Sequence, residues 1–118
     1  MTNAENILLK ELKKKRIISA DFEKESQNLL KETVPFNKPS DLHIRDAIVV
    51  LGTILKEDLD NHYYITSVKT GMFNNVLAYA IIQRKEDQTV DIVVYAKEGM
   101  IKQNLAGKAM EKIKNVLS

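Results

Sequence analysis

The N-terminal residues 4–32 read as two short helices that together are too small to form a stable unit. Leu8 and Leu12 mark the apolar side of the first helix, and Phe22, Leu29 and Leu30 mark that of the second. Short helices gain most of their stability from packing an apolar face against something else. The rest of the chain or a second copy must therefore bury this face, and the sequence predicts a protein that self-associates.

Three short runs within residues 8–32 follow the pattern of a known module. They are Leu9-Lys10-Glu11-Leu12, Ile17-Ile18-Ser19, and Phe22-Glu23 followed by Leu29-Leu30. In these runs the chain resembles the short helical hairpin called SHOCT. The resemblance implies an accessory module without catalytic residues, one that serves oligomerisation or partner contacts.

The overall composition is that of one folded domain. The 118 residues are 44% hydrophobic, enough for one core, and the formal net charge is only +2. With no cysteine, the chain has no disulfide, no thiolate zinc site and no cysteine nucleophile. The start does not have the pattern of a signal peptide, and no apolar run approaches the length of a membrane span, about 20 residues. A cytoplasmic protein without membrane contact is expected.

Two prolines suggest where the chain divides. Pro35 and Pro39 forbid a continuous helix between them. We therefore expect a hairpin appendage over 1–34 and a second domain over 39–118. Ser40 can cap a helix over 41–57, although the β-branched run within 47–51 leaves a strand as the alternative.

The second half of the chain has clearer patterns. Residues 63–69, 76–84 and 89–97 are strand-like and are separated by polar turns, which predicts a three-stranded antiparallel sheet. In the third strand Val90, Ile92, Val94 and Ala96 share one face. A helix starting at about Met100 should pack on the sheet. The expected fold class is α+β: a helical hairpin, a helix, three strands and a final helix.

Two groups of residues are candidates for contact with a protein partner. The first is the apolar stripe of the hairpin, Phe22, Leu29 and Leu30. The second is Met72 and Phe73, two large apolar residues in a loop whose turn chemistry requires neither. Phe73 either folds back onto the core or anchors a partner.

Nucleic acid is the alternative partner. The predicted order of helix, three strands and helix is also that of double-stranded-RNA-binding domains, although fold order is weak support for function. The candidate phosphate contacts are basic residues in two segments: Lys13, Lys14, Lys15, Arg16, Lys102, Lys108 and Lys112. For the first run, a solvated helix end predicts the same residues and is the favoured interpretation.

No catalytic, cofactor-binding or metal-binding residue is predicted. His62 with Asp58 and Asp60 could hold a metal, but an acidic turn produces the same cluster without a ligand role. The serines lack a nucleophile elbow, and the four glycines form no phosphate-binding loop. The sequence therefore predicts a small non-enzymatic interaction or adaptor protein, of the regulator, inhibitor or immunity type, that binds a protein partner.

Overall fold

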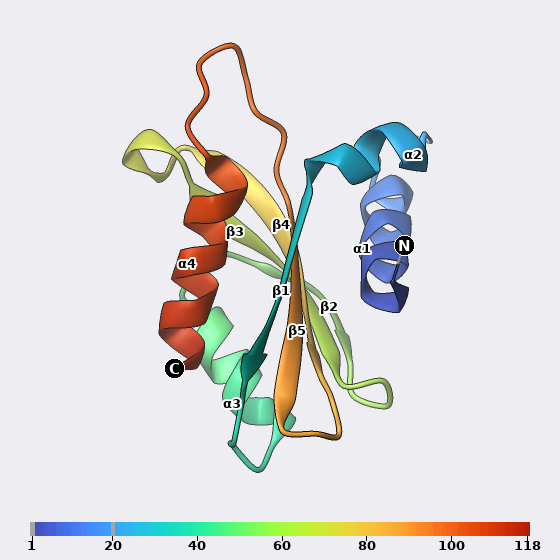
Figure 1. The fold of residues 1–118 in the computed structure, drawn as a ribbon, viewed down its shortest axis with the longest axis vertical. Coiled ribbons are helices and arrows are strands. Elements are labelled where there is room, and N and C mark those ends of the chain that lie inside the picture. The colour runs from blue at the N-terminus through green and yellow to red at the C-terminus, as the bar shows by residue number, and fades with distance from the viewer. Residues whose placement is uncertain (1, 20) are drawn as a thin grey trace.

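The computed structural model describes residues 2–19 and 21–118 as one five-stranded antiparallel sheet with helices on both faces (Figure 1). The order of the strands across the sheet is β1-β5-β4-β3-β2. The elements in chain order are α1 (Asn3–Lys14), α2 (Phe22–Glu25), the 3₁₀ helix η1 (Ser26–Asn28), β1 (Leu29–Pro35), α3 (Asp41–Ile48), β2 (Ile54–Asp58), β3 (Tyr63–Thr70), the 3₁₀ helix η2 (Met72–Asn74), β4 (Val76–Arg84), β5 (Thr89–Tyr95) and α4 (Leu105–Leu117).

The α+β class is confirmed, and the predicted three-stranded sheet is incomplete. The three predicted strands are β3, β4 and β5, which occupy the centre of the sheet as an antiparallel meander. An edge strand flanks them on each side, β1 next to β5 and β2 next to β3. The face expected for Val90, Ile92, Val94 and Ala96 is correct, because all four lie in one buried cluster.

The helical hairpin predicted over residues 1–34 is wrong in its second half. The helix that begins at Phe22 ends at Glu25, and the chain then enters β1, which pairs with β5 from Leu29 opposite Tyr95 to Pro35 opposite Thr89. Leu29 and Leu30 therefore point to opposite faces of the sheet, and they share no stripe. β1 also joins the strands of the second half in one sheet, across the boundary expected near residue 34.

The helix predicted over 41–57 covers only its first half, Asp41–Ile48, and the alternative prediction of a strand over 47–51 is wrong. The Ser40 hydroxyl caps α3 as expected, accepting a hydrogen bond from the Leu42 backbone N–H at 3.1 Å. The helix ends at Ile48, and β2 follows after Gly52. A Cβ on Gly52 would lie 2.3 Å from the backbone oxygen of Ser67, so this close approach to β3 requires glycine.

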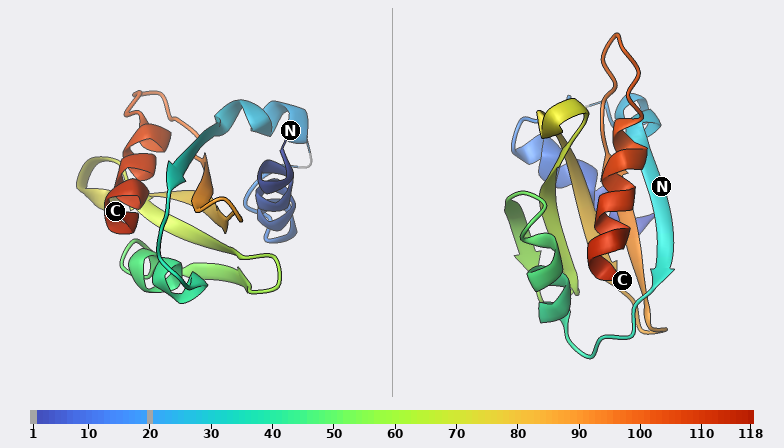
Figure 2. Two further views of the ribbon diagram at one scale, coloured as in Figure 1. Left: turned by 60° about the horizontal axis from the view of Figure 1, so that its bottom comes forward. Right: turned by 90° about the vertical axis from the view of Figure 1, so that its left-hand side faces the viewer.

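Helices cover both faces of the sheet (Figure 2). α3 and α4 pack on one face, where Ile44, Met110 and Ile113 meet Tyr64 and Ile92. α1 covers the other face. Three leucines of α1 are buried there: Leu8, Leu9 and Leu12. They pack against Ile65, Ile81 and Val93 of the sheet. The N-terminal apolar side is thus buried within the same chain.

The final helix begins five residues later than predicted. α4 starts at Leu105, and residues 97–104 form a loop that projects at one end of the molecule (Figure 1). Asn104, in the left-handed region with φ 56°, precedes the helix. A Glu98 carboxylate oxygen accepts a hydrogen bond from the Leu105 backbone N–H at 2.9 Å. This carboxylate supplies the cap that ends the loop and starts the helix.

Both edge strands carry charged residues. β1 contains Lys31 and Glu32, while β2 contains Lys56, Glu57 and Asp58 and has an irregular register between Ile54 and Lys56. Charges and bulges on an outer strand discourage pairing with another sheet.

A buried contact joins the segment before β1 to the end of β5. The Tyr95 hydroxyl donates to a carboxylate oxygen of Glu25 at 3.3 Å, and both side chains are buried. The other Glu25 oxygen accepts from the Ser19 backbone N–H at 3.2 Å. Burial, together with the neighbouring Glu25 charge and its hydrogen bond, raises the pKa of Tyr95 to about 12.

Replacement of the buried Ile92 tests the assignment of the sheet faces. Ile92→Ala is expected to lower the free energy of unfolding by about 2 to 5 kcal/mol, because it removes a fully buried side chain beneath α3 and α4. Chemical denaturation measures the change. A loss under about 0.5 kcal/mol would contradict the burial of this side chain.

The Tyr95 contact predicts a specific loss of stability at high pH. A phenol with an elevated pKa in the folded state stabilises the protein fully below its unfolded pKa of about 10, and this contribution disappears as the pH rises towards 12. The free energy of unfolding should therefore fall more steeply over this range in the wild type than in Tyr95→Phe. Equal slopes in the two proteins would contradict the assignment. Tyr64, whose pKa burial also raises, contributes equally to both curves.

Candidate interaction surface

One end of the molecule presents two loops that are held against each other. The first contains η2 between β3 and β4, and the second is the 97–104 loop between β5 and α4; both lie at the same end in Figures 1 and 2. The Met72 backbone N–H donates to the Gln103 side-chain oxygen at 2.9 Å. The Thr70 hydroxyl donates to the Leu105 carbonyl at 3.4 Å. These contacts fix the first loop to the start of α4.

Lys112 of α4 adds a further link. Its ammonium donates to the Lys69 carbonyl at 2.7 Å and also to the side-chain oxygen of Asn74. Gly71, with φ 79°, opens the first loop, and a Cβ there would lie 3.1 to 3.2 Å from Val76, Gln103 and Leu105. The loop is therefore built on specific contacts with the framework.

Large apolar side chains project from this end into solvent. Phe73 is 90% exposed, Ile101 77%, Met72 61% and Leu77 50%, while Met100 is fully exposed. We call these five residues the apolar tip. They are half of the ten exposed large apolar side chains among residues 2–19 and 21–118. Of the two fates considered for Phe73, the structure excludes folding back onto the core.

The backbone at Phe73 is also unusual. Phe73 has φ 60° and ψ 20°, in the left-handed region that phenylalanine rarely adopts, and Asn74 follows with φ 55°. Such a conformation costs of order 1–3 kcal/mol and is found most often at binding sites. The backbone at Phe73 thus carries a conformational cost while its aromatic ring stays exposed to solvent.

Lysines surround the apolar tip. The segments 69–77 and 97–108 with Lys112 contain five lysines and one glutamate, a formal charge of +4, whereas the whole chain carries +2. Lys69, Lys97, Lys102 and Lys108 form no ion pair within the described residues. The single acid, Glu98, faces the first turn of α4.

The other predicted partner-binding residues are half-buried and pack against the two core clusters. Phe22 packs against the buried cluster beneath α1, with the Lys13 ammonium 5.8 Å from its ring centre. Leu29 packs in the same cluster, and Leu30 contributes to the cluster on the opposite face. The structure therefore does not bring Phe22, Leu29 and Leu30 together as an exposed stripe.

The predicted nucleic-acid contacts fall into two separated groups. Lys13 and Lys14 form the last turn of α1, on one face of the sheet, and Lys15 and Arg16 follow it, with Lys15 3.5 Å from Glu11. The second group, on the loop before α4 and on α4 itself, lies on the opposite side of the sheet; it consists of Lys102, Lys108 and Lys112. One continuous basic surface does not form, and only the second group adjoins the apolar tip.

At the opposite end of β3, Asp41 holds two basic side chains. Its carboxylate lies 2.7 Å from His62 Nδ1 and 2.7 Å from Arg84 Nε. His62 therefore pairs with Asp41 and not with Asp58 or Asp60, the two acids of the metal cluster considered from sequence. Asp58 accepts two hydrogen bonds from Asn61, which lower the pKa of Asp58. In the described part of the chain no three His, Asp or Glu side chains converge to hold a metal ion.

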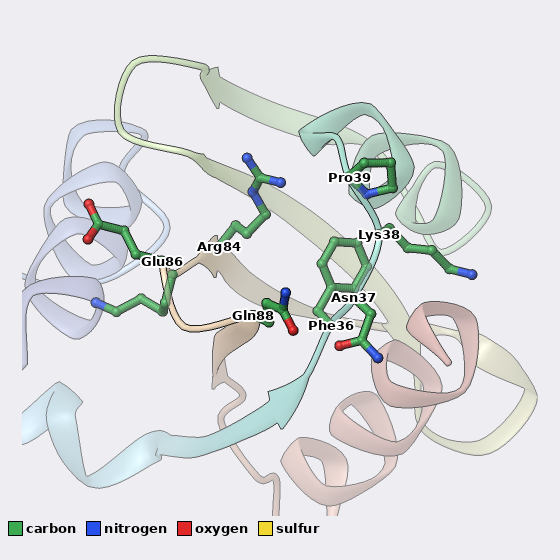
Figure 3. A pocket seen from close by; sticks show the side chains of 8 residues that line it. Phe36, Asn37, Lys38, Pro39, Arg84, Glu86 and Gln88 are labelled. Carbon is green, nitrogen blue, oxygen red and sulfur yellow. The ribbon is translucent and has the colours of Figure 1, made fainter.

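A cavity of about 360 Å³ lies beside Arg84, between residues 36–39 and the β4–β5 turn (Figure 3). Phe36 and Gln88 face the space, while the charged ends of Lys38 and Glu86 point away from it. The Arg84 side chain is already paired with Asp41. The charged side chains of the lining thus pair elsewhere, as Lys85 does with Asp91, or point away from the space, and the apolar tip is the stronger candidate for a binding surface.

The sequence indicated only part of this surface. The sequence identifies Met72 and Phe73 as loop residues without a structural need. It places Met100 and Ile101 in the final helix, because the helical spacing of apolar residues continues back to Ile101. The available signal was Gly99 together with Asn104, a residue type that tolerates the left-handed backbone observed there.

Comparisons with known proteins place the chain in no group. No protein family, curated protein or solved structure matches it. No helix in the described ranges is long and apolar enough to cross a membrane.

Lys112 provides a test of how firmly the first loop is held. Lys112→Met should increase amide hydrogen exchange across residues 70–75, since it removes the donor to Lys69 and Asn74, while the free energy of global unfolding changes by less than about 1 kcal/mol. Lys108→Met, at an exposed position one turn earlier on the same helix, is the matched control. Equal exchange in the two variants would show that the Lys112 contacts do not order the loop.

Proposed function

We propose that the protein is a non-enzymatic interaction protein that binds a protein partner through the apolar tip. The observation that carries the proposal is the exposure of Phe73 and Ile101 on two loops held by specific hydrogen bonds. Groups of exposed apolar side chains on a protein surface often mark an interaction site. Aromatic side chains on an ordered loop are typical anchors of protein interfaces.

The chemistry of the apolar tip favours a protein over a nucleic acid. Phe73 could stack on a base, but Met72, Met100, Ile101 and Leu77 are aliphatic and have no counterpart on a phosphate backbone. A protein surface can supply an apolar socket for all five side chains.

Self-association, which the sequence predicts, loses its original basis in this fold. The hairpin stripe that motivated it is packed within the chain. The charges on β1 and β2 also disfavour pairing through the sheet edges. Self-association through the apolar tip would bring two sets of lysines together, which is unfavourable.

Substitutions at the apolar tip test the proposal. The tagged protein is purified from its own cells as wild type, as Phe73→Ser, as Ile101→Ser and as Leu59→Ser. A partner should be retained by the wild type and lost from both tip variants, because truncation of an interface anchor costs about 2 kcal/mol or more, at least about 30-fold in affinity.

Leu59→Ser is the matched control for this experiment. Leu59 is an exposed apolar residue in the β2–β3 turn, at the other end of β3 from the apolar tip. The control must retain the partner, and circular dichroism must show that all variants are folded. Identical sets of bound proteins in all four preparations would rule out the apolar tip as the binding surface.

A further inference from the structure

The lysines around the apolar tip constrain the chemistry of the partner. Lys69, Lys97, Lys102 and Lys108 have no acidic partner within 4 Å in the described ranges. The tip segments carry +4, so the remainder of the chain carries −2. The charges around the most exposed apolar side chains are therefore predominantly positive.

The charges that have partners at this end reinforce the asymmetry. Glu98 is the only acid in these segments, and its carboxylate is directed at the backbone N–H of Leu105. Lys112 is directed inward, to Lys69 and Asn74 of the first loop. The charges that remain for an incoming surface are thus all positive. Around an apolar contact that excludes water, unpaired lysines are repelled by a basic surface and attracted to an acidic one. They therefore select a partner surface of negative charge.

We infer that the partner site is an acidic protein segment, in which an apolar socket for Phe73 is bordered by Asp or Glu side chains that meet the lysines. The inference rests on the proposed function and specifies the partner of the same surface. The apolar contacts supply affinity and the carboxylates supply selectivity and speed of association. Lysine suits this role because its ammonium group can adapt to carboxylates in several positions.

A random-peptide display library provides a defined probe. Peptides are selected at low salt on the immobilised wild-type protein, after removal of those that bind Phe73→Ser. The selected peptides should contain an apolar residue flanked by Asp or Glu. A synthetic representative should bind about tenfold more weakly when the salt is raised from low to molar concentration, because the added ions screen exposed charge pairs.

Paired lysine substitutions identify the charges involved. The double variant Lys97→Gln, Lys102→Gln should bind the selected peptide about tenfold more weakly and with a shallower dependence on salt. The double variant Lys38→Gln, Lys85→Gln removes the same net charge far from the apolar tip and should bind like the wild type. Equal losses in the two double variants would attribute the effect to net charge and overturn the inference.

The remaining outcomes separate the inference from the proposed function. Selected peptides that are apolar without acidic bias would overturn the acidic socket and leave the apolar tip as the binding surface. A selection that yields no peptide dependent on Phe73 would count against both. Binding to phosphatidylglycerol vesicles, or to a single-stranded oligonucleotide, that is lost in Phe73→Ser would assign the apolar tip to a lipid or nucleic-acid surface and overturn the protein partner.

Discussion

The fold depends on a sheet whose central strands are apolar on both faces. In β4 and β5 successive residues alternate between the two buried clusters, with Ile82 and Ile92 in one and Ile81 and Val93 in the other. Each face needs a cover, because exposed apolar surface is unfavourable in water. α3 and α4 provide one cover, and α1 provides the other. The N-terminal helix is therefore an essential layer of the domain.

The segment that connects α1 to β1 is held by hydrogen bonds to the buried side chain of Glu25. Residues 15–19 and 21–28 lie between α1, on one face of the sheet, and the edge where β1 begins. The buried Glu25 meets Tyr95 and the Ser19 backbone at this crossing. A carboxylate at this depth is stable because hydrogen bonds compensate its loss of solvation.

The central strands and the faces of β5 could be predicted from sequence, whereas the edge strands could not. The middle of the sheet is rich in apolar and β-branched residues, with a continuous apolar run in β4 and alternation in β5, and these patterns are visible without tertiary information. β1 and β2 carry charged residues that obscure the alternation, and Leu29-Leu30 fits a helix as well as a strand. Their conformation is decided by pairing with β5 and β3, which are distant in sequence.

The candidate surface was predictable at Phe73 and unpredictable at Met100 and Ile101. A large apolar residue in a polar turn is visible in the sequence. The start of α4 depends on the Glu98 carboxylate and on the left-handed Asn104, so the helical spacing alone extends the helix too far. The loop contacts through Gln103 and Lys112 likewise require the folded arrangement.

The charged outer strands also bear on what kind of complex this molecule can join. A sheet whose edge strands carry charges and an irregular register resists the addition of a further strand, and so resists growth by edge pairing into an open-ended polymer. Under the function proposed above, a partner is bound at the end that bears the two loops, away from the sheet edges. The stoichiometry of such a complex is set by the number of sites on the other component.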